Sequence, residues 1–171
     1  MPATYTLISS VTVGSGGAAN MTFSSIPATY TDLCVLLSVR SAAAGGDDQL
    51  RININSTGVG SNFTIRVLQG SGSSVSNGSS STGWIVGGIN ADGNTANTFS
   101  SVQVYFPNYA GSTNKSFSID SAMENNATTA YAELSAALYS NTSAISSLSF
   151  TTPSANLMQY STAYLYGISN A

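Results

Sequence analysis

The residues of this chain that could carry out chemistry are few, and Cys34 is the first to weigh. It is the sole cysteine among 171 residues and lies inside the apolar run 33–39. The chain contains no histidine, so neither a Cys-His pair nor a Ser-His-Asp triad can form, and the commonest zinc ligand is absent. A thiol among apolar neighbours has a raised pKa and reacts slowly. We therefore expect Cys34 to be a small core residue.

Carboxylate chemistry would need two acidic side chains facing each other across a cleft, as in a glycosidase. Asp92 precedes a glycine in a predicted turn, and Asp47 lies with Asp48 in a predicted loop. Glu133 is expected to face solvent. No spacing brings two of these residues together, so we predict no catalytic residue and no enzyme. The acidic residues are Asp32, Asp47, Asp48, Asp92, Asp120, Glu124 and Glu133.

Two acidic loops, at 45–48 and 90–97, offer the oxygen atoms that a calcium ion accepts as ligands. Their spacing does not match the EF-hand pattern, and the turn preference of Asp, Asn and Gly accounts for both loops. The glycine-rich segments 13–18 and 70–74 suggest phosphate loops, but no lysine follows either one. We therefore predict no metal site and no cofactor.

The composition is unusually poor in charge. Only 6% of the residues are charged, 42% are hydrophobic, and the formal net charge is -3. Charged residues average about 25% in globular proteins, and here serine, threonine, asparagine and glycine take their place. Four basic residues are too few to neutralise a nucleic-acid backbone or to hold a basic helix on a membrane. We expect a β-rich protein on the outside of a cell or particle, without nucleic acid or membrane as a partner.

Short runs with alternating apolar and polar residues are separated by turn clusters along the whole chain, which predicts a single-domain antiparallel β-sandwich or barrel over residues 1–171. The run 33–39 is apolar on both faces, which indicates a central strand covered on both sides. The segment 126–140 also has helical character, but Leu134, Ala136 and Leu138 alternate as in a strand, with Glu133 on the opposite face. The Gly/Ser-rich segment 70–83 is predicted to be a flexible loop. Strands are expected at 4–13, 20–25, 33–41, 49–56, 61–69, 83–90, 98–106, 115–123, 130–139, 145–152 and 161–168.

Aromatic side chains leave three interpretations open, namely a sugar-stacking surface, a protein–protein interface, and ordinary half-buried strand positions. These residues are Trp84, Tyr105, Tyr109, Tyr164 and Tyr166. Arg51 and Arg66 fall on the polar faces of strands expected to be neighbours, so we predict that they lie side by side.

Three segments carry a resemblance to a known group of proteins. They are "TYTLI" at 4–8, the segment 23–40 with "IPATYTDL" leading into an apolar strand that ends in arginine, and "YLYGI" at 164–168. Together with "NTF", "PNY" and "NK" within 97–117, they resemble a group of small virion proteins of tailed bacteriophages. The shared motifs carry no catalytic signature. The resemblance implies a virion protein with a jelly-roll fold.

A capsid decoration (cement) protein is the role that we expect, bound on the capsid exterior as a homotrimer that bridges subunits of the major capsid protein. The predicted strands run from about residue 4 to 168 and leave no segment for the shaft of a fibre, which favours this role. The alternatives are a tail fibre or receptor-binding accessory protein, and a carbohydrate-binding module for a host surface glycan. We expect its contacts with neighbouring proteins to come from the N-terminal strand, the 70–83 loop and exposed aromatics such as Tyr109.

Overall fold

The computed structural model of the protein describes residues 4–57, 62–81, 87–126 and 129–169. These residues form twelve strands and no α-helix, and hence no helix long and apolar enough to cross a membrane. The all-β prediction is confirmed. The strands are β1 (Tyr5–Thr12), β2 (Asn20–Phe23), β3 (Asp32–Val39), β4 (Asp47–Ile54), β5 (Phe63–Gly70), β6 (Val75–Ser80), β7 (Gly87–Asn90), β8 (Ser100–Phe106), β9 (Lys115–Met123), β10 (Tyr131–Tyr139), β11 (Leu148–Thr151) and β12 (Thr162–Ile168).

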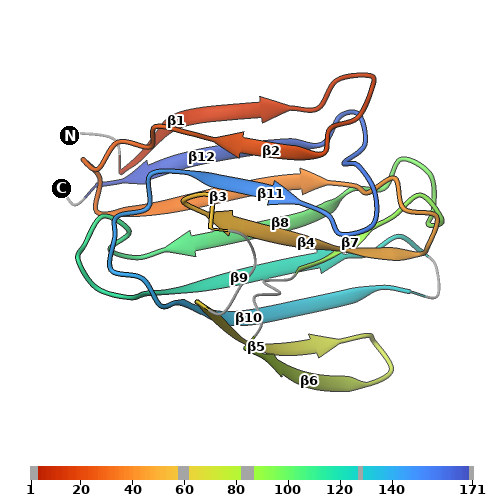
Figure 1. Ribbon diagram of the computed structural model, residues 1–171. Coiled ribbons are helices and arrows are strands. Elements are labelled where there is room, and N and C mark those ends of the chain that lie inside the picture. Colours follow the sequence, from red (N-terminus) through yellow and green to blue (C-terminus); the bar gives the residue numbers. More distant parts are fainter. Residues whose placement is uncertain (1–3, 58–61, 82–86, 127–128, 170–171) are drawn as a thin grey trace.

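Two antiparallel sheets pack face to face and make the predicted sandwich (Figure 1). The larger sheet has eight strands in the order β1-β12-β3-β8-β9-β10-β5-β6, and the smaller has four in the order β2-β11-β4-β7. The chain crosses at nearly every step between the small sheet and the first four strands of the large one, β1, β12, β3 and β8. That winding is the jelly-roll arrangement.

Two hairpins inserted into this jelly roll, β5–β6 and β9–β10, widen the large sheet on one side. β7, at the edge of the small sheet, packs against β9 and reaches β10. β5 and β6 project past it at the lower end of Figure 1, and we call this pair the wing. The face of the large sheet that packs on the small sheet is called the inner face, and the opposite one the outer face.

The core lies between the sheets and is built from the alternating positions that the sequence marks as apolar. In β8, Val102, Val104 and Phe106 point inward and are buried, while Ser101 and Gln103 point outward. Phe106 meets Phe117 of β9 with ring centroids 4.6 Å apart. Each fully buried side chain of this size contributes about 1.5–3 kcal/mol to folding, so this alternation fixes the register of the strands.

The prediction of a flexible loop at 70–83 is wrong for residues 75–80, which form β6. The turn that joins β5 to β6 is short, with the amide of Ser71 donating to the carbonyl of Ser74 (3.0 Å) and Gly72 at a φ of +82°. β6 pairs with β5 along its whole length, yet nearly all its side chains are exposed. A strand that is exposed on both faces shows no alternation of apolar and polar residues. The serine- and glycine-rich sequence of β6 was therefore interpreted as a loop. Residues 82 and 83 lie outside the described residues.

The prediction that β3 is covered on both faces holds at Cys34 alone. Val35, Leu37 and Val39 face the core, and Cys34 is buried on the outer face. Leu36, the next residue on the outer face, is 39% exposed. The apolar run therefore marks a strand whose outer face is partly bare.

The faces predicted for β10 are reversed. Leu134 lies on the outer face and is 52% exposed, whereas Ser135 and Tyr139 are buried on the inner face. The inner space is filled from neighbouring strands: Phe63 of β5 stacks on Tyr139 at 4.9 Å, and Phe117 of β9 pairs with the small Ala137. Next to these rings the inner positions of β10 hold the small Ser135 and Ala137, and Leu134 is left on the outer face.

Two of the four basic residues are buried and are bound by main-chain carbonyl groups. The ammonium group of Lys115 donates to the carbonyl oxygens of Gly111 (2.6 Å), Thr113 (2.7 Å) and Thr142 (3.2 Å). The guanidinium group of Arg40 donates to carbonyl oxygens of the 92–98 segment, including those of Thr95 and Thr98 at 2.8 Å. Each cation thus holds together loops that join one strand to the next.

Replacing Lys115 with methionine is expected to lower the free energy of unfolding by about 2 kcal/mol, because buried carbonyl groups lose their donor. The matched control is Arg66→Met, since Arg66 is exposed and its side chain bonds only the carbonyl of its neighbour Ile65. Urea denaturation followed by circular dichroism measures both variants. Equal stability of the two variants would contradict a structural role for the buried ammonium group.

Candidate functional site

The outer face of the large sheet presents one continuous row of side chains across its strands. Cross-strand partners in an antiparallel sheet point to the same face, so the pairing registers define this row. It contains Tyr164, Leu36, Gln103, Asp120, Leu134 and Leu68, contributed by six neighbouring strands. Apolar side chains lie toward its two ends, and an amide and a carboxylate lie in its centre.

Large apolar side chains are exposed over much of this face. Val75 on β6 is 77% exposed, and Tyr5 and Leu7 on β1 are 54% and 52% exposed. Most proteins leave few such side chains together in solvent, and a larger patch indicates a contact surface. We call the set the apolar outer surface; it consists of Tyr5, Leu7, Leu36, Leu68, Val75, Leu134 and Tyr164.

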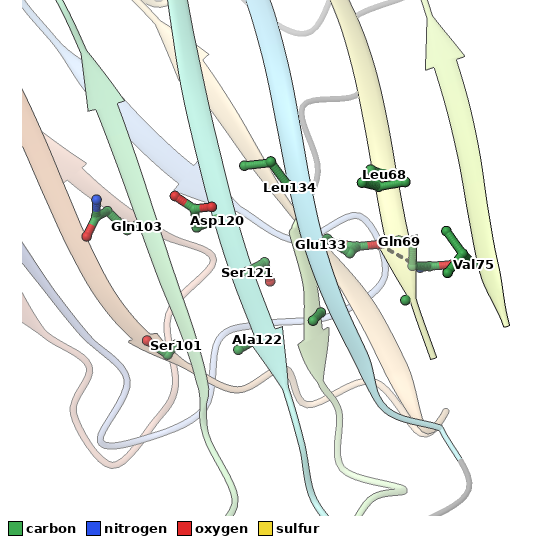
Figure 2. A pocket seen from close by; sticks show the side chains of 12 residues that line it. Leu68, Gln69, Val75, Ser101, Gln103, Asp120, Ser121, Ala122, Glu133 and Leu134 are labelled. Carbon is green, nitrogen blue, oxygen red and sulfur yellow. Dashed lines mark hydrogen bonds between the residues drawn. The ribbon is translucent and has the colours of Figure 1, made fainter. Parts of the chain in front are cut away.

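A trough of about 540 Å³ lies on this face between β8 and the wing (Figure 2). Leu68, Val75 and Leu134 line its apolar end, while Gln103 and Asp120 lie toward the opposite end. The trough is open and suits an apolar group of a partner with a hydrogen-bonding group beside it.

Glu133 borders the trough from the inner face and is already engaged. One carboxylate oxygen accepts from the side-chain amide of Gln69 (2.6 Å) and the other from the backbone amide of Gly88 (2.5 Å). Figure 2 shows the first of these bonds. Glu133 thus ties the wing and β10 to β7, so the expectation that it faces solvent is wrong. Asp120 remains as an exposed carboxylate of the trough.

The other acidic residues mostly hold the protein's own loops. Asp32 accepts from the hydroxyl of Tyr105 (2.6 Å) and from the backbone amide of Asn108 (2.7 Å). Asp48, predicted to lie in a loop, is buried in β4 and accepts from the hydroxyl of Ser41 (2.6 Å). These carboxylates accept hydrogen bonds from groups of the protein itself and thereby stabilise its loops.

Glu124 likewise accepts from the backbone amides of Asn125 (3.0 Å) and Asn126 (2.7 Å). Asp92 lies in the predicted turn, and its side chain is exposed. Asp47 is the exposed first residue of β4.

The two acidic loops considered for calcium do lie against each other. The amide of Asp92 donates to the carbonyl of Ala43 (2.9 Å), and that of Gly93 to the carbonyl of Gly45 (3.0 Å). Arg40 binds carbonyl oxygens of the 90–97 loop and its neighbour Thr98, which places a positive charge beside this loop. Within the described ranges, no three Asp, Glu, Cys or His side chains come together as metal ligands.

Tyr30, Tyr109 and Gly167, which come from the segments 23–40, 97–117 and 164–168, lie close together at one end of the sandwich. Tyr109 is fully buried, its hydroxyl donating to the carbonyl of Pro27 and accepting from the amide of Tyr30 (3.4 Å). The ring of Tyr30 packs on Gly167, where an added Cβ would come within 2.3 Å of the ring. The prediction that Tyr109 is an exposed contact residue is therefore wrong, because its hydroxyl holds the loop that precedes β3.

Of the remaining aromatic candidates, Tyr105 and Tyr166 flank Cys34 on the outer face as its cross-strand partners. Burial beneath this layer raises the pKa of the Cys34 thiol, as the sequence suggested. Tyr164 is 39% exposed and belongs to the apolar outer surface. Trp84 lies outside the described residues.

Arg51 and Arg66 do not lie side by side. Arg51 is on β4 of the small sheet and Arg66 on β5 of the large one, each on the face turned away from the core. The sequence placed their strands next to each other, but the jelly-roll winding sends consecutive strands β4 and β5 into different sheets.

Sequence reasoning missed most of the apolar outer surface. A signal was present in β5, where Phe63, Ile65 and Val67 alternate inward and Leu68 breaks the pattern. Val75 stands alone among serine and glycine residues and gave no such signal. A comparison of the chain with protein-family models and with curated proteins finds no match.

The Cys34 thiol is expected to stay unreactive toward Ellman's reagent in the native protein and to react fully in denaturant, because it is 2% exposed. The matched control carries Cys34→Ser and Ser79→Cys, which moves the thiol to an exposed position on β6. That variant should react at once without denaturant. Rapid labelling of Cys34 in the native protein would contradict the buried assignment.

The hydrogen bond to Asp32, helped by burial, raises the pKa of Tyr105 to about 12. An unperturbed tyrosine titrates near pH 10, so this interaction stabilises the fold fully below pH 10 and is lost as the pH rises toward 12. Asp32→Asn should bring the pKa back toward its ordinary value. Carbon-13 NMR of the tyrosine rings measures it, with Tyr105→Phe identifying the signal; an unchanged pKa in the Asp32 variant would refute the coupling.

Proposed function

We propose that this protein is a structural, non-enzymatic virion component, a capsid decoration protein that binds the outside of the shell as a homotrimer and bridges subunits of the major capsid protein. The virion assignment rests on the resemblance of "TYTLI", "IPATYTDL" and "YLYGI" to the phage group. The observation that carries the binding role is the apolar outer surface, which extends from β1 to β6 on one sheet face.

The chemistry of this surface supports contact with a protein. Leu36, Leu134 and Leu68 are exposed aliphatic side chains, and burying them against a partner yields about 25 cal/mol for each Å² of apolar area. Gln103 and Asp120 lie among them and add the few polar contacts that orient a partner. Many copies on one particle would then act together, so that a modest affinity for each copy suffices.

The ordered loops support the same role. Lys115, Arg40 and Asp32 bind main-chain groups of the protein itself, which stabilises the loops at their positions. A rigid surface loses little conformational entropy when it binds, and this favours a stable contact with a shell.

Electron cryo-microscopy of intact particles tests the location. We expect density for the protein at three-fold or quasi-three-fold positions on the capsid exterior. Density confined to the tail would overturn the decoration role and favour the tail-fibre alternative.

Leu134→Glu should reduce occupancy on the capsid at least tenfold, because a charge would be buried in the contact. Gln49→Glu is the matched control: it places the same group at an exposed site on β4 of the small sheet. Band intensities of purified particles on a gel measure occupancy. Equal occupancy of both variants would show that the trough does not face the shell.

A second candidate, binding of a host surface glycan, is favoured by one feature of the outer row. Tyr164 presents a partly exposed ring in the same row as the amide of Gln103 and the carboxylate of Asp120, a combination that suits a sugar ring with its hydroxyl groups. Binding on a glycan array that Tyr164→Ala abolishes would support this function over capsid contact.

A further inference from the structure

The large sheet ends in an edge strand on each side. Of the described strands in that sheet, β1 and β6 have a neighbour on one side only. An edge strand offers unpaired backbone donors and acceptors, and proteins usually protect such edges with lysine, proline or a covering segment. Neither β1 nor β6 contains a charged residue or a proline.

We propose that copies of this chain associate by pairing β6 of one copy with β1 of the next, so that the large sheets join edge to edge. This deepens the proposed function by naming the contact between copies in the oligomer. The edges of the apolar outer surface, including Leu68 and Val75, would then serve self-association, and its centre, from Leu36 to Leu134, would remain for the shell.

The direction of the strands fits this pairing. Every ladder in the eight-stranded sheet is antiparallel, so β1 and β6 at its two ends run in opposite directions. A second copy related by rotation about an axis along the strands therefore places its β1 antiparallel to β6 of the first. The same rotation keeps the outer faces on one side of the joined sheet.

The side chains at the two edges match as well. Tyr5 and Leu7 on β1 are exposed on the outer face, and so are Val75 and Leu68 at the wing. Edge pairing would bring these apolar groups together across the junction. The register shift between Leu7 and Ser9 is a local irregularity of β1, and it leaves Leu7 on the outer face.

A second copy suits these edges better than an unrelated peptide, because a head-to-tail contact repeated in a closed ring covers both edges at once. A two-fold contact between two β6 strands would cover one edge of each copy and leave both β1 strands open. A ring closes without a free edge, which is the outcome that protects a sheet from aggregation.

The experiment uses two single variants of the full chain, Leu7→Lys on β1 and Val75→Lys on β6, and sedimentation velocity. The wild type should sediment as an oligomer, and each variant as a monomer of 17.4 kDa. An equimolar mixture of the two variants should form a species of two chains, because it restores one intact β6 and one intact β1. Ser116→Lys, exposed on the outer face of β9 away from both edges, is the matched control and should remain oligomeric.

Four outcomes would overturn the proposal: a monomeric wild type, a Leu7 variant that stays oligomeric, a Val75 variant that stays oligomeric, or a mixture that stays monomeric. The second of these together with a monomeric Val75 variant would point to a two-fold contact between β6 strands. Circular dichroism checks folding, and Ser10→Lys and Asn77→Lys, also exposed, are the second variants for the two edges. Because association is measured on the isolated chain, its failure would leave the virion location to the particle images.

Discussion

The structure depends on one constraint: two buried cations must be hydrogen-bonded by carbonyl groups of the main chain. The ammonium group of Lys115 bonds carbonyls of the β8–β9 and β10–β11 loops, and the guanidinium of Arg40 bonds the β7–β8 loop. Two of these loops carry the chain from one sheet to the other. A buried cation without bonds would cost several kcal/mol, so the loops must present their carbonyl oxygens at these points. The two cations thereby hold two of the crossings between the sheets, β7–β8 and β10–β11, in place.

Polar side chains of the sequence motifs bind the protein's own main chain. Asp32, Tyr109 and Arg40 lie in the segments 23–40 and 97–117, and each binds backbone groups that are far away in the sequence. Their spacing in the sequence reflects which loops must meet. Motifs of this kind indicate the fold, whereas the proposed binding role rests on the exposed side chains of the outer face.

The strands with alternating burial could be predicted from the sequence, because one apolar face against a core forces a period of two. β8 and β9 follow this rule, and the predicted bounds of β9 equal the observed ones. β6 could not be found, since a strand exposed on both faces leaves no pattern. In β10 the pattern was present and misleading, because Leu134 and Leu138 alternate as core residues would. Phe63 and Phe117 of the neighbouring strands fill the inner space instead, and the sequence of β10 does not show this. The apolar outer surface was missed for the same reason.

The place of β3 in the sheet has a consequence for how the protein forms. Its two neighbours are β8 and β12, so residues 32–39 cannot complete their pairing until residues 162–168 have left the ribosome. Contacts between such distant segments are slow to close, because much chain entropy is lost before they form. Until then the apolar segment around Cys34 lacks one of its two partner strands, and an unpaired strand edge of this kind can pair with another chain.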